Sequence, residues 1–202
     1  MKFKLIFLTF TFLFSHCTPE ITDDLTNVLD SYATVPECVF NYTEVTSKTI
    51  KFFPKCESVY GIIVINEKTD LSVSELQKAF RKMTSLAGGI RVENSKLTNL
   101  AFLTTRKKSG YFDMQCDAYG IFILNNENLT DASMLSLLNL ADDDSGNECK
   151  VEIVNNRKLN TEDLCNQAHL KSFMDLRVKG NLKDCGKYRI WIMVLMVAKM
   201  FP

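Results

Sequence analysis

The chain has 202 residues, of which 46% are hydrophobic and 24% are charged, and its 24 basic and 24 acidic residues give a formal net charge of zero. This length suits one globular domain with a hydrophobic core of its own. The balanced charge argues against a nucleic acid or an anionic membrane surface as the partner.

Residues 1–17 have the pattern of a secretory signal peptide. A basic start at Lys2 and Lys4 is followed by the uncharged apolar run 5–14 and by a cut expected after Cys17. The run is too short to span a bilayer, which takes about 20 residues as a helix. Cleavage removes two of the 24 basic residues and none of the 24 acidic ones, so the mature chain has a net charge near −2. We therefore predict a secreted protein.

Cysteines and glycosylation motifs indicate the same compartment. The chain has seven cysteines, and removal of Cys17 leaves six, an even number that predicts three disulfides in an oxidising environment. Asn41 and Asn128 each open an Asn-x-Thr triplet, so we expect a glycan on both side chains. The six remaining cysteines are Cys38, Cys56, Cys116, Cys149, Cys165 and Cys185.

Residues 18–37 are polar and show no periodicity, so we interpret them as a short leader before the folded unit. Beyond it, four segments of strand length resemble one another. Each is rich in β-branched residues, ends at an asparagine and is followed by a leucine a few residues later. The terminal asparagines recur at a nearly regular interval, and such a period predicts stacked units that share one continuous core. The segments are 61–66, 89–94, 120–125 and 150–155.

Asparagine has a physical use at the end of each segment. It tolerates the left-handed backbone conformation where the chain leaves a strand, and its amide group is able to hydrogen-bond to neighbouring repeats. In the last two segments the order strand-Asn-Asn-x-x-Leu recurs, at 124–129 and 154–159. We expect chain corners at Gly88-Gly89 and Asn125-Asn126.

Short helices are predicted between the strands. Ser72 and Glu75 have the spacing of a capping box, and apolar residues follow at helical intervals. Thr130 is expected to cap a second short helix, and Thr161, which precedes two acidic residues, a third. The repeating unit we infer is a strand, a turn, a short helix and the next strand.

The C-terminal segment 187–202 is treated as a tail outside the domain. It contains nine consecutive apolar residues, 190–198, which are too few for a transmembrane helix. The segment is interpreted either as an element packed on the last repeat or as an interrupted anchor. Membrane anchoring is therefore not expected, but it is left open.

Two cysteines stand on each side of the repeats. Cys38 and Cys56 both stand before the first strand, and Cys165 and Cys185 stand after the last, with a similar spacing in the chain. With the repeated Asn-Asn-x-x-Leu pattern, this order resembles the receptor L domain, the leucine-rich-repeat-like module of insulin and epidermal-growth-factor receptors. Among members of that family, the chain is similar to the secreted or membrane-tethered L-domain proteins of nematodes.

The resemblance implies a single β-solenoid domain over residues 38–186, wound as a right-handed β-helix with short helices between strands and a disulfide cap at each end. It implies that Cys38 pairs with Cys56 and that Cys165 pairs with Cys185. It also implies binding and not catalysis. The receptors carry two such domains around a cysteine-rich region, followed by a kinase, whereas this chain shows one L domain only, so their signalling role is not transferred.

The stacking of the repeats predicts the third disulfide. Cys116 and Cys149 each stand just ahead of a strand, one repeat apart, so stacking of the repeats brings them together. Neighbouring strands lie about 4.8 Å apart, which suits the Cα separation of a disulfide.

Alternation along the strands predicts which side chains point away from the core. The charged residues Arg91, Glu93 and Glu152 share one side of their strands, which is expected to face solvent. Apolar side chains occupy the matching positions of the other strands, so the outward set resembles an apolar protein-binding patch with a charged border. Coverage by the leader or the tail, or a slipped register, would remove this patch. The candidate binding face comprises Ile62, Val64, Arg91, Glu93, Phe122, Leu124 and Glu152.

The sequence shows no recognisable catalytic set. Only His169 remains after signal cleavage, and no nucleophile, phosphate-binding or dinucleotide-binding motif accompanies it. Paired cysteines leave no ligands for zinc, and no cofactor is predicted. We therefore predict an extracellular, non-catalytic module that binds a protein or peptide. The alternatives are a structural component of the extracellular matrix and, with less support, a secreted hydrolase that depends on His169.

Overall fold

The computed structural model describes residues 21–103, 110–140, 148–166 and 174–185. The predicted signal peptide, the tail 187–202 and His169 lie outside the described residues. Within the described part of the chain, no helix is both long enough and apolar enough to cross a membrane.

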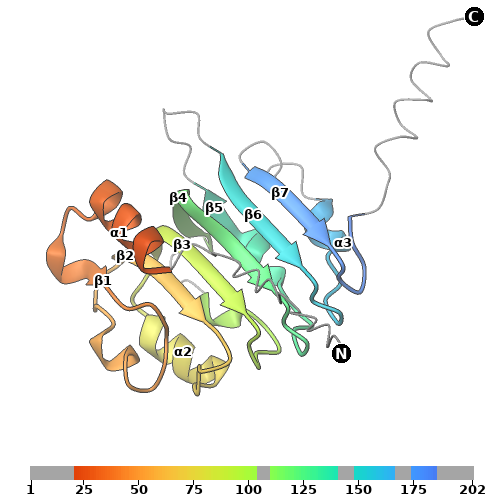
Figure 1. The fold of residues 1–202 in the computed structure, drawn as a ribbon, viewed down its shortest axis with the longest axis horizontal. Helices are drawn as coiled ribbons and strands as arrows, with labels where there is room; N and C mark the ends of the chain where they lie inside the picture. Colours follow the sequence, from red (N-terminus) through yellow and green to blue (C-terminus); the bar gives the residue numbers. More distant parts are fainter. Residues whose placement is uncertain (1–20, 104–109, 141–147, 167–173, 186–202) are drawn as a thin grey trace, which may run out of the picture.

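The strands form one parallel sheet (Figure 1). Its order is β1-β2-β3-β4-β6-β7, and β5 pairs with β4 beside that path. Because all pairs are parallel, each connection must return the chain to the same edge of the sheet before the next strand begins. The strands are β1 (Val39–Phe40), β2 (Ser58–Ile65), β3 (Ser85–Glu93), β4 (Phe112–Leu124), β5 (Leu138–Leu140), β6 (Cys149–Val154) and β7 (Met174–Lys179).

The four predicted segments correspond to β2, β3, β4 and β6, and each strand begins earlier than predicted. The strands β1, β5 and β7 are not among the predicted segments. In β7, Leu176 and Val178 alternate with charged residues, but the strand is followed by Gly180 where the other repeats have asparagine. Gly180 has a φ of 75°, so it takes the left-handed conformation that asparagine takes elsewhere. A fifth repeat was therefore not predicted, because Gly180 replaces the asparagine that marks the other repeats.

Paired positions of adjacent strands form the centre of the core. Ile63, Ile90, Ile121 and Val151 lie side by side in β2, β3, β4 and β6, and each is at most 2% exposed. No such side chain would be buried in one repeat alone, because the neighbouring strand supplies the covering surface. The hydrophobic core thus runs continuously through the repeats, as the regular interval between the terminal asparagines predicts.

Helix α2 (Val73–Phe80) begins at the predicted capping box. The Ser72 backbone N–H donates to the Glu75 carboxylate at 2.8 Å, and the Glu75 N–H donates to the Ser72 hydroxyl at 3.3 Å. These bonds satisfy N–H groups at the start of the helix, which have no partner inside it. Leu76 and Phe80 are buried beneath the helix.

The other two predicted helices differ from expectation. The second is only a 3₁₀ turn, and the third is a single helical turn. Neither threonine caps its helix: the Thr130 hydroxyl donates to the Thr98 carbonyl at 3.1 Å, and the Thr161 hydroxyl donates to the Lys183 carbonyl at 2.6 Å. Both hydroxyl groups thus donate to backbone carbonyl groups of neighbouring repeats. The elements are η4 (Ser133–Leu137) and α3 (Glu162–Cys165), and the other 3₁₀ turns are η1 (Pro36–Cys38), η2 (Ile50–Phe52) and η3 (Ala101–Leu103).

Three disulfides join the same cysteine pairs that the sequence analysis expects. The bond between Cys116 and Cys149 links β4 to β6 across a Cα separation of 5.2 Å, and both residues are buried. The others lie nearer the two ends of the sheet and connect Cys38 to Cys56 and Cys165 to Cys185.

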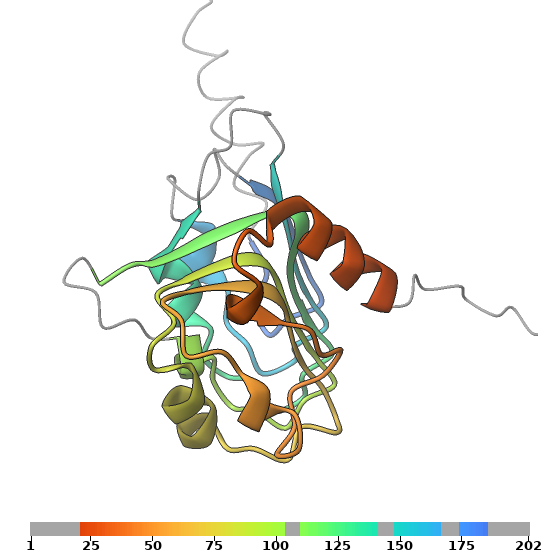
Figure 2. The same ribbon diagram turned by 90° about the vertical axis from the view of Figure 1, so that its left-hand side faces the viewer.

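Helix α1 (Ile21–Tyr32) lies against the outside of the sheet, where it contacts β2, β3 and β4 (Figure 2). It occupies the segment that the sequence analysis interprets as a leader without periodicity. Leu25 and Val28 are 3% and 0% exposed and pack on Ile62 and Val64. The helix was not predicted because its apolar residues form only a narrow stripe at helical spacing, and polar residues occupy the other faces.

The prediction of a chain corner at Gly88-Gly89 is wrong. Gly88-Gly89 lies inside β3 and does not form a corner. Gly88 has a φ of 137°, and a Cβ there would come within 2.7 Å of a Val28 methyl group and would also clash with the Gly61 carbonyl. Glycine therefore permits the close approach of α1 and β2. The corner predicted at Asn125-Asn126 is confirmed, since Asn125 follows β4 with a φ of 54°.

The two roles expected of each terminal asparagine, the left-handed backbone and the hydrogen bonds between repeats, fall on two neighbouring residues. Asn94, Asn125 and Asn155 take left-handed conformations with φ of 51°, 54° and 60°. The residue that follows each of them makes most of the bonds between repeats. Asn66 departs from the pattern, because it is absent from the left-handed set and its side chain instead accepts from the Lys68 N–H at 2.9 Å.

A chain of buried and half-buried polar side chains, here called the asparagine ladder, connects the repeats: Ser95, Asn126, Asn156, Asn181 and Asp184. The Ser95 hydroxyl donates to Asn126 at 2.7 Å, and the Asn126 amide donates to Asn156 at 3.0 Å. The Asn156 amide donates to Asn181 at 3.0 Å, and the Asn181 amide donates to Asp184 at 2.9 Å. Each amide also donates at 2.9 Å to a strand carbonyl, those of Val92, Ile123 and Ile153.

Asp184 ends the asparagine ladder and makes its stability depend on pH. Burial raises the pKa of the Asp184 carboxyl, but the N–H groups of Asn181 and Gly180 donate to the carboxylate, and the net effect is a lowered pKa. Such a group stabilises the fold above its unfolded pKa of about 3.9, and this contribution is lost as the pH falls through the folded pKa.

We therefore expect acidification from about pH 5.5 to about pH 3 to cost the wild type up to about 1 kcal/mol more unfolding free energy than it costs Asp184→Asn. Urea unfolding of both proteins at both pH values measures this difference. Equal sensitivity to pH in the two proteins would contradict the role assigned to Asp184.

Candidate binding face on the outside of the sheet

The outward side chains of the strands line up in rows across the sheet. The register pairs Val64, Arg91, Phe122, Glu152 and Arg177 in one row. Since alternate residues of a strand point to opposite faces, this row lies opposite the buried core positions. The next outward row consists of Glu93, Leu124, Val154 and Lys179.

Helix α1 covers one end of these rows, so part of the predicted face is not available. Ile62 and Val64 point outward as expected, but they are 0% and 5% exposed because Leu25 and Val28 pack on them. The prediction that these two side chains belong to an exposed face is wrong. Coverage by the leader segment, which the sequence analysis considered, is the physical reason.

The part of the outer side that α1 leaves uncovered is here called the open face. It retains the other five predicted residues, all of them half-buried: Arg91, Glu93, Phe122, Leu124 and Glu152. The register adds Lys150, Val154 and Arg177 beside them. An apolar centre of Phe122, Leu124 and Val154 is thus bordered by charged side chains.

Phe122 lies between two cations. The Arg91 guanidinium lies 5.7 Å from the centroid of its ring, and the Lys150 ammonium lies 5.4 Å from it. The Tyr119 ring meets Phe122 edge-on, with 5.1 Å between ring centroids. A cation within about 6 Å of an aromatic face is attracted by the quadrupole of the ring. These contacts hold the Phe122 ring in one orientation at the surface.

Ion pairs order the charged border of the open face. Arg91 pairs with Glu93 at 2.5 Å, and Glu152 pairs with Lys150 at 3.1 Å and with Arg177 at 3.7 Å. Exposed pairs of this kind contribute little to stability, typically about 0–1 kcal/mol. Their effect here is to fix charges of both signs around an apolar centre, which favours orientation and selectivity in binding.

Two ionisable side chains at the boundary between α1 and the open face have shifted pKa values. The Tyr119 hydroxyl is buried beside the Arg91 guanidinium. Burial raises the pKa of the Tyr119 phenol, although the nearby Arg91 cation opposes this effect. Burial likewise raises the pKa of Asp24 on α1, again against the attraction of Arg91. The edge of α1 therefore contributes to the electrostatics of the face.

The open face contains three residues that the predicted face lacked. Val154 and Lys150 lie inside the predicted segment 150–155 and follow the same alternation as Glu152, but the predicted face did not include them. Arg177 was missed because β7 was not recognised. Within the described ranges, no group of three or more His, Cys, Asp or Glu side chains is placed to hold a metal ion. The open face presents apolar and charged side chains.

Comparison with known proteins gives one match. The family model described as Receptor L domain matches residues 55–175, a range that lies within the predicted domain 38–186. This family has a β-solenoid fold and is non-catalytic, and its members are extracellular binding modules of receptor type. A search of curated proteins and a search of solved structures returned no match.

Proposed function

The chain belongs to the receptor L domain family, and from that premise we propose that it is a secreted, non-catalytic module that binds an extracellular protein or peptide through its open face. The observation that carries the proposal is the position of the Phe122 ring, which lies at the surface beside the Arg91 and Lys150 cations and among apolar neighbours. Interfaces concentrate binding energy in a few aromatic and arginine residues surrounded by a polar rim. The open face has this composition.

Further features support an extracellular location. The three disulfides suit an oxidising compartment. The Asn41 and Asn128 side chains belong to exposed residues, which leaves them accessible for the N-glycosylation predicted from their sequons. Family membership further favours the right-handed β-helical winding and the signal peptide at 1–17 that the sequence predicts. Mass analysis of the secreted protein would detect both the cut after residue 17 and the glycans.

The test uses the full chain, secreted from eukaryotic cells, against a display library of extracellular domains from the source organism. We expect the selected binders to lose roughly 30-fold or more in affinity for Phe122→Asp, since the loss of an interface hot spot costs about 2 kcal/mol or more. Binding is measured by surface plasmon resonance.

A matched control is Leu137→Asp. Leu137 is an exposed apolar residue at 42% exposure on η4, away from the open face, and the same change there should leave affinity within about 2-fold. Binders that lose affinity equally for both variants, or that are insensitive to Phe122→Asp, would remove the open face as the binding site.

A further inference from the structure

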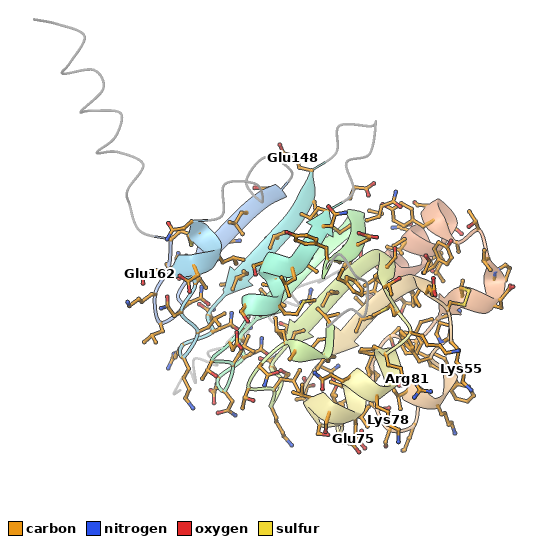
Figure 3. All side chains as sticks on the ribbon, turned by 180° about the vertical axis from the view of Figure 1, so that it is seen from behind. Lys55, Glu75, Lys78, Arg81, Glu148 and Glu162 are labelled. Carbon is orange, nitrogen blue, oxygen red and sulfur yellow. A yellow bond between two sulfur atoms is a disulfide. The ribbon has the colours of Figure 1, made fainter. Side chains whose placement is uncertain are left out.

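A second surface with a different chemistry lies beside helix α2. Basic side chains from the segment around η2 and from α2 line a groove with a cavity volume of about 360 Å³. Figure 3 shows Lys55, Lys78 and Arg81 gathered with Glu75 at one end of the molecule, far from Glu148 and Glu162. The basic residues of the groove are Lys51, Lys55, Lys78, Arg81 and Lys82.

The two walls of this basic groove are held in place by the core. The Phe53 and Phe80 rings pack with 4.5 Å between their centroids, joining the segment that follows η2 to the end of α2. The disulfide between Cys38 and Cys56 fixes the chain next to Lys55. The cations are therefore carried on ordered backbone, so a ligand would not have to order two loops before binding.

The positive charge of the groove is not neutralised from within. All five basic residues are exposed, and none of them forms an ion pair with another described residue. Among the described residues of the lining, the only carboxylate is that of Glu75, which accepts from Ser72 at 2.6 Å and 2.8 Å in the capping box. Five positive charges against one negative charge leave an excess of four, on a chain whose formal net charge is zero.

We infer that the basic groove binds a sulfated polysaccharide. Clusters of exposed lysine and arginine attract polyanions, and lysine presents a mobile point charge that suits a sulfate group. The apolar residues of the lining are buried or half-buried at the floor, so a ligand meets the charged rim first. An acidic protein would instead need exposed apolar anchors for tight binding.

This surface is separate from the open face. The groove comes from η2 and α2, whereas the open face comes from β3, β4, β6 and β7. The inference therefore goes beyond the proposed function, and each is tested without the other: Phe122→Asp should leave binding to the polysaccharide unchanged.

The experiment uses the full secreted chain and heparin as the probe, with affinity measured at several salt concentrations. About 0.7 of a counterion is released for each charge neutralised on a flexible polyanion, so five contacts predict roughly a 100-fold loss of affinity between about 50 and 200 mM salt. Lys78→Glu/Lys82→Glu should weaken heparin binding roughly 10-fold or more. Lys51→Glu/Lys55→Glu, on the other wall, should do the same.

The matched control is Arg157→Glu/Lys158→Glu, which changes the net charge equally at exposed positions after β6. It should bind heparin within about 2-fold of the wild type. Absence of heparin binding by the wild type, or an equal loss in the control, would overturn the inference. Competition by polyglutamate as effective as that by heparin of equal charge would also overturn it and assign the groove to an acidic peptide.

Discussion

Replacing Asn126 with leucine is expected to lower the free energy of unfolding by about 3–5 kcal/mol. The Asn126 side chain is 0% exposed and accepts from both the backbone N–H and the hydroxyl of Ser95, at 2.9 and 2.7 Å. Its amide donates to the Val92 carbonyl and to Asn156. Leucine has a similar volume but leaves these buried groups without partners, at about 1–3 kcal/mol each.

Chemical denaturation and thermal unfolding measure the effect. For a domain of this size the loss corresponds to a decrease in Tm of roughly 10 °C. The control is Asn27→Leu, the same substitution at an exposed position of α1, which should stay within about 0.5 kcal/mol of the wild type. If both variants were equally stable, the asparagine ladder would not hold the repeats together.

Removing the disulfide between β4 and β6 with Cys116→Ala/Cys149→Ala is expected to cost about 3–4 kcal/mol. The two cysteines are separated by 33 residues, and the cross-link restricts the unfolded chain by an amount that grows with this separation. The bond also joins the strand on which Phe122 lies to its neighbour β6. Weakening the pairing of β4 with β6 should therefore disorder the open face under milder denaturing conditions than those that disorder the basic groove.

Unfolding in the presence of a thiol reductant provides the control for this prediction. Reduction opens all three disulfides in the wild type, so the difference between variant and wild type should shrink to about 1 kcal/mol, the packing loss of two buried sulfur atoms. If the difference were the same with and without the reductant, packing and not the cross-link would be its cause.

Local chemistry explains the parts of the fold that the sequence predicted well. Runs of β-branched residues form strands. The side chains of Ser72 and Glu75 each accept from the backbone N–H of the other and cap α2. Asn125 and Asn155 take the left-handed turn because few other residues tolerate it. Each signal lies within a few residues. Where a local signal was ambiguous, as with Gly180 in place of asparagine, the repeat was missed.

The two candidate surfaces differ in how far the sequence revealed them. Alternation correctly assigned Phe122 and Leu124 to the outward side, but it carried no information on what lies above that side. Ile62 and Val64 have the same alternation and are covered by α1. The basic groove left no sequence signal, since Lys51 and Lys55 meet Lys78 and Lys82 only after Phe53 packs on Phe80.

The sequence by itself determined the repeat period, the four central strands and the resemblance to the receptor L domain, and that resemblance implied two of the three cysteine pairs. These properties depend on residue types at short, regular spacing. Only the tertiary structure decided that α1 covers one end of the outer side, that β7 adds a further strand to the sheet, and that a basic groove forms beside α2. Exposure and charge density are properties of a surface, and a surface exists only when segments distant in the chain pack together.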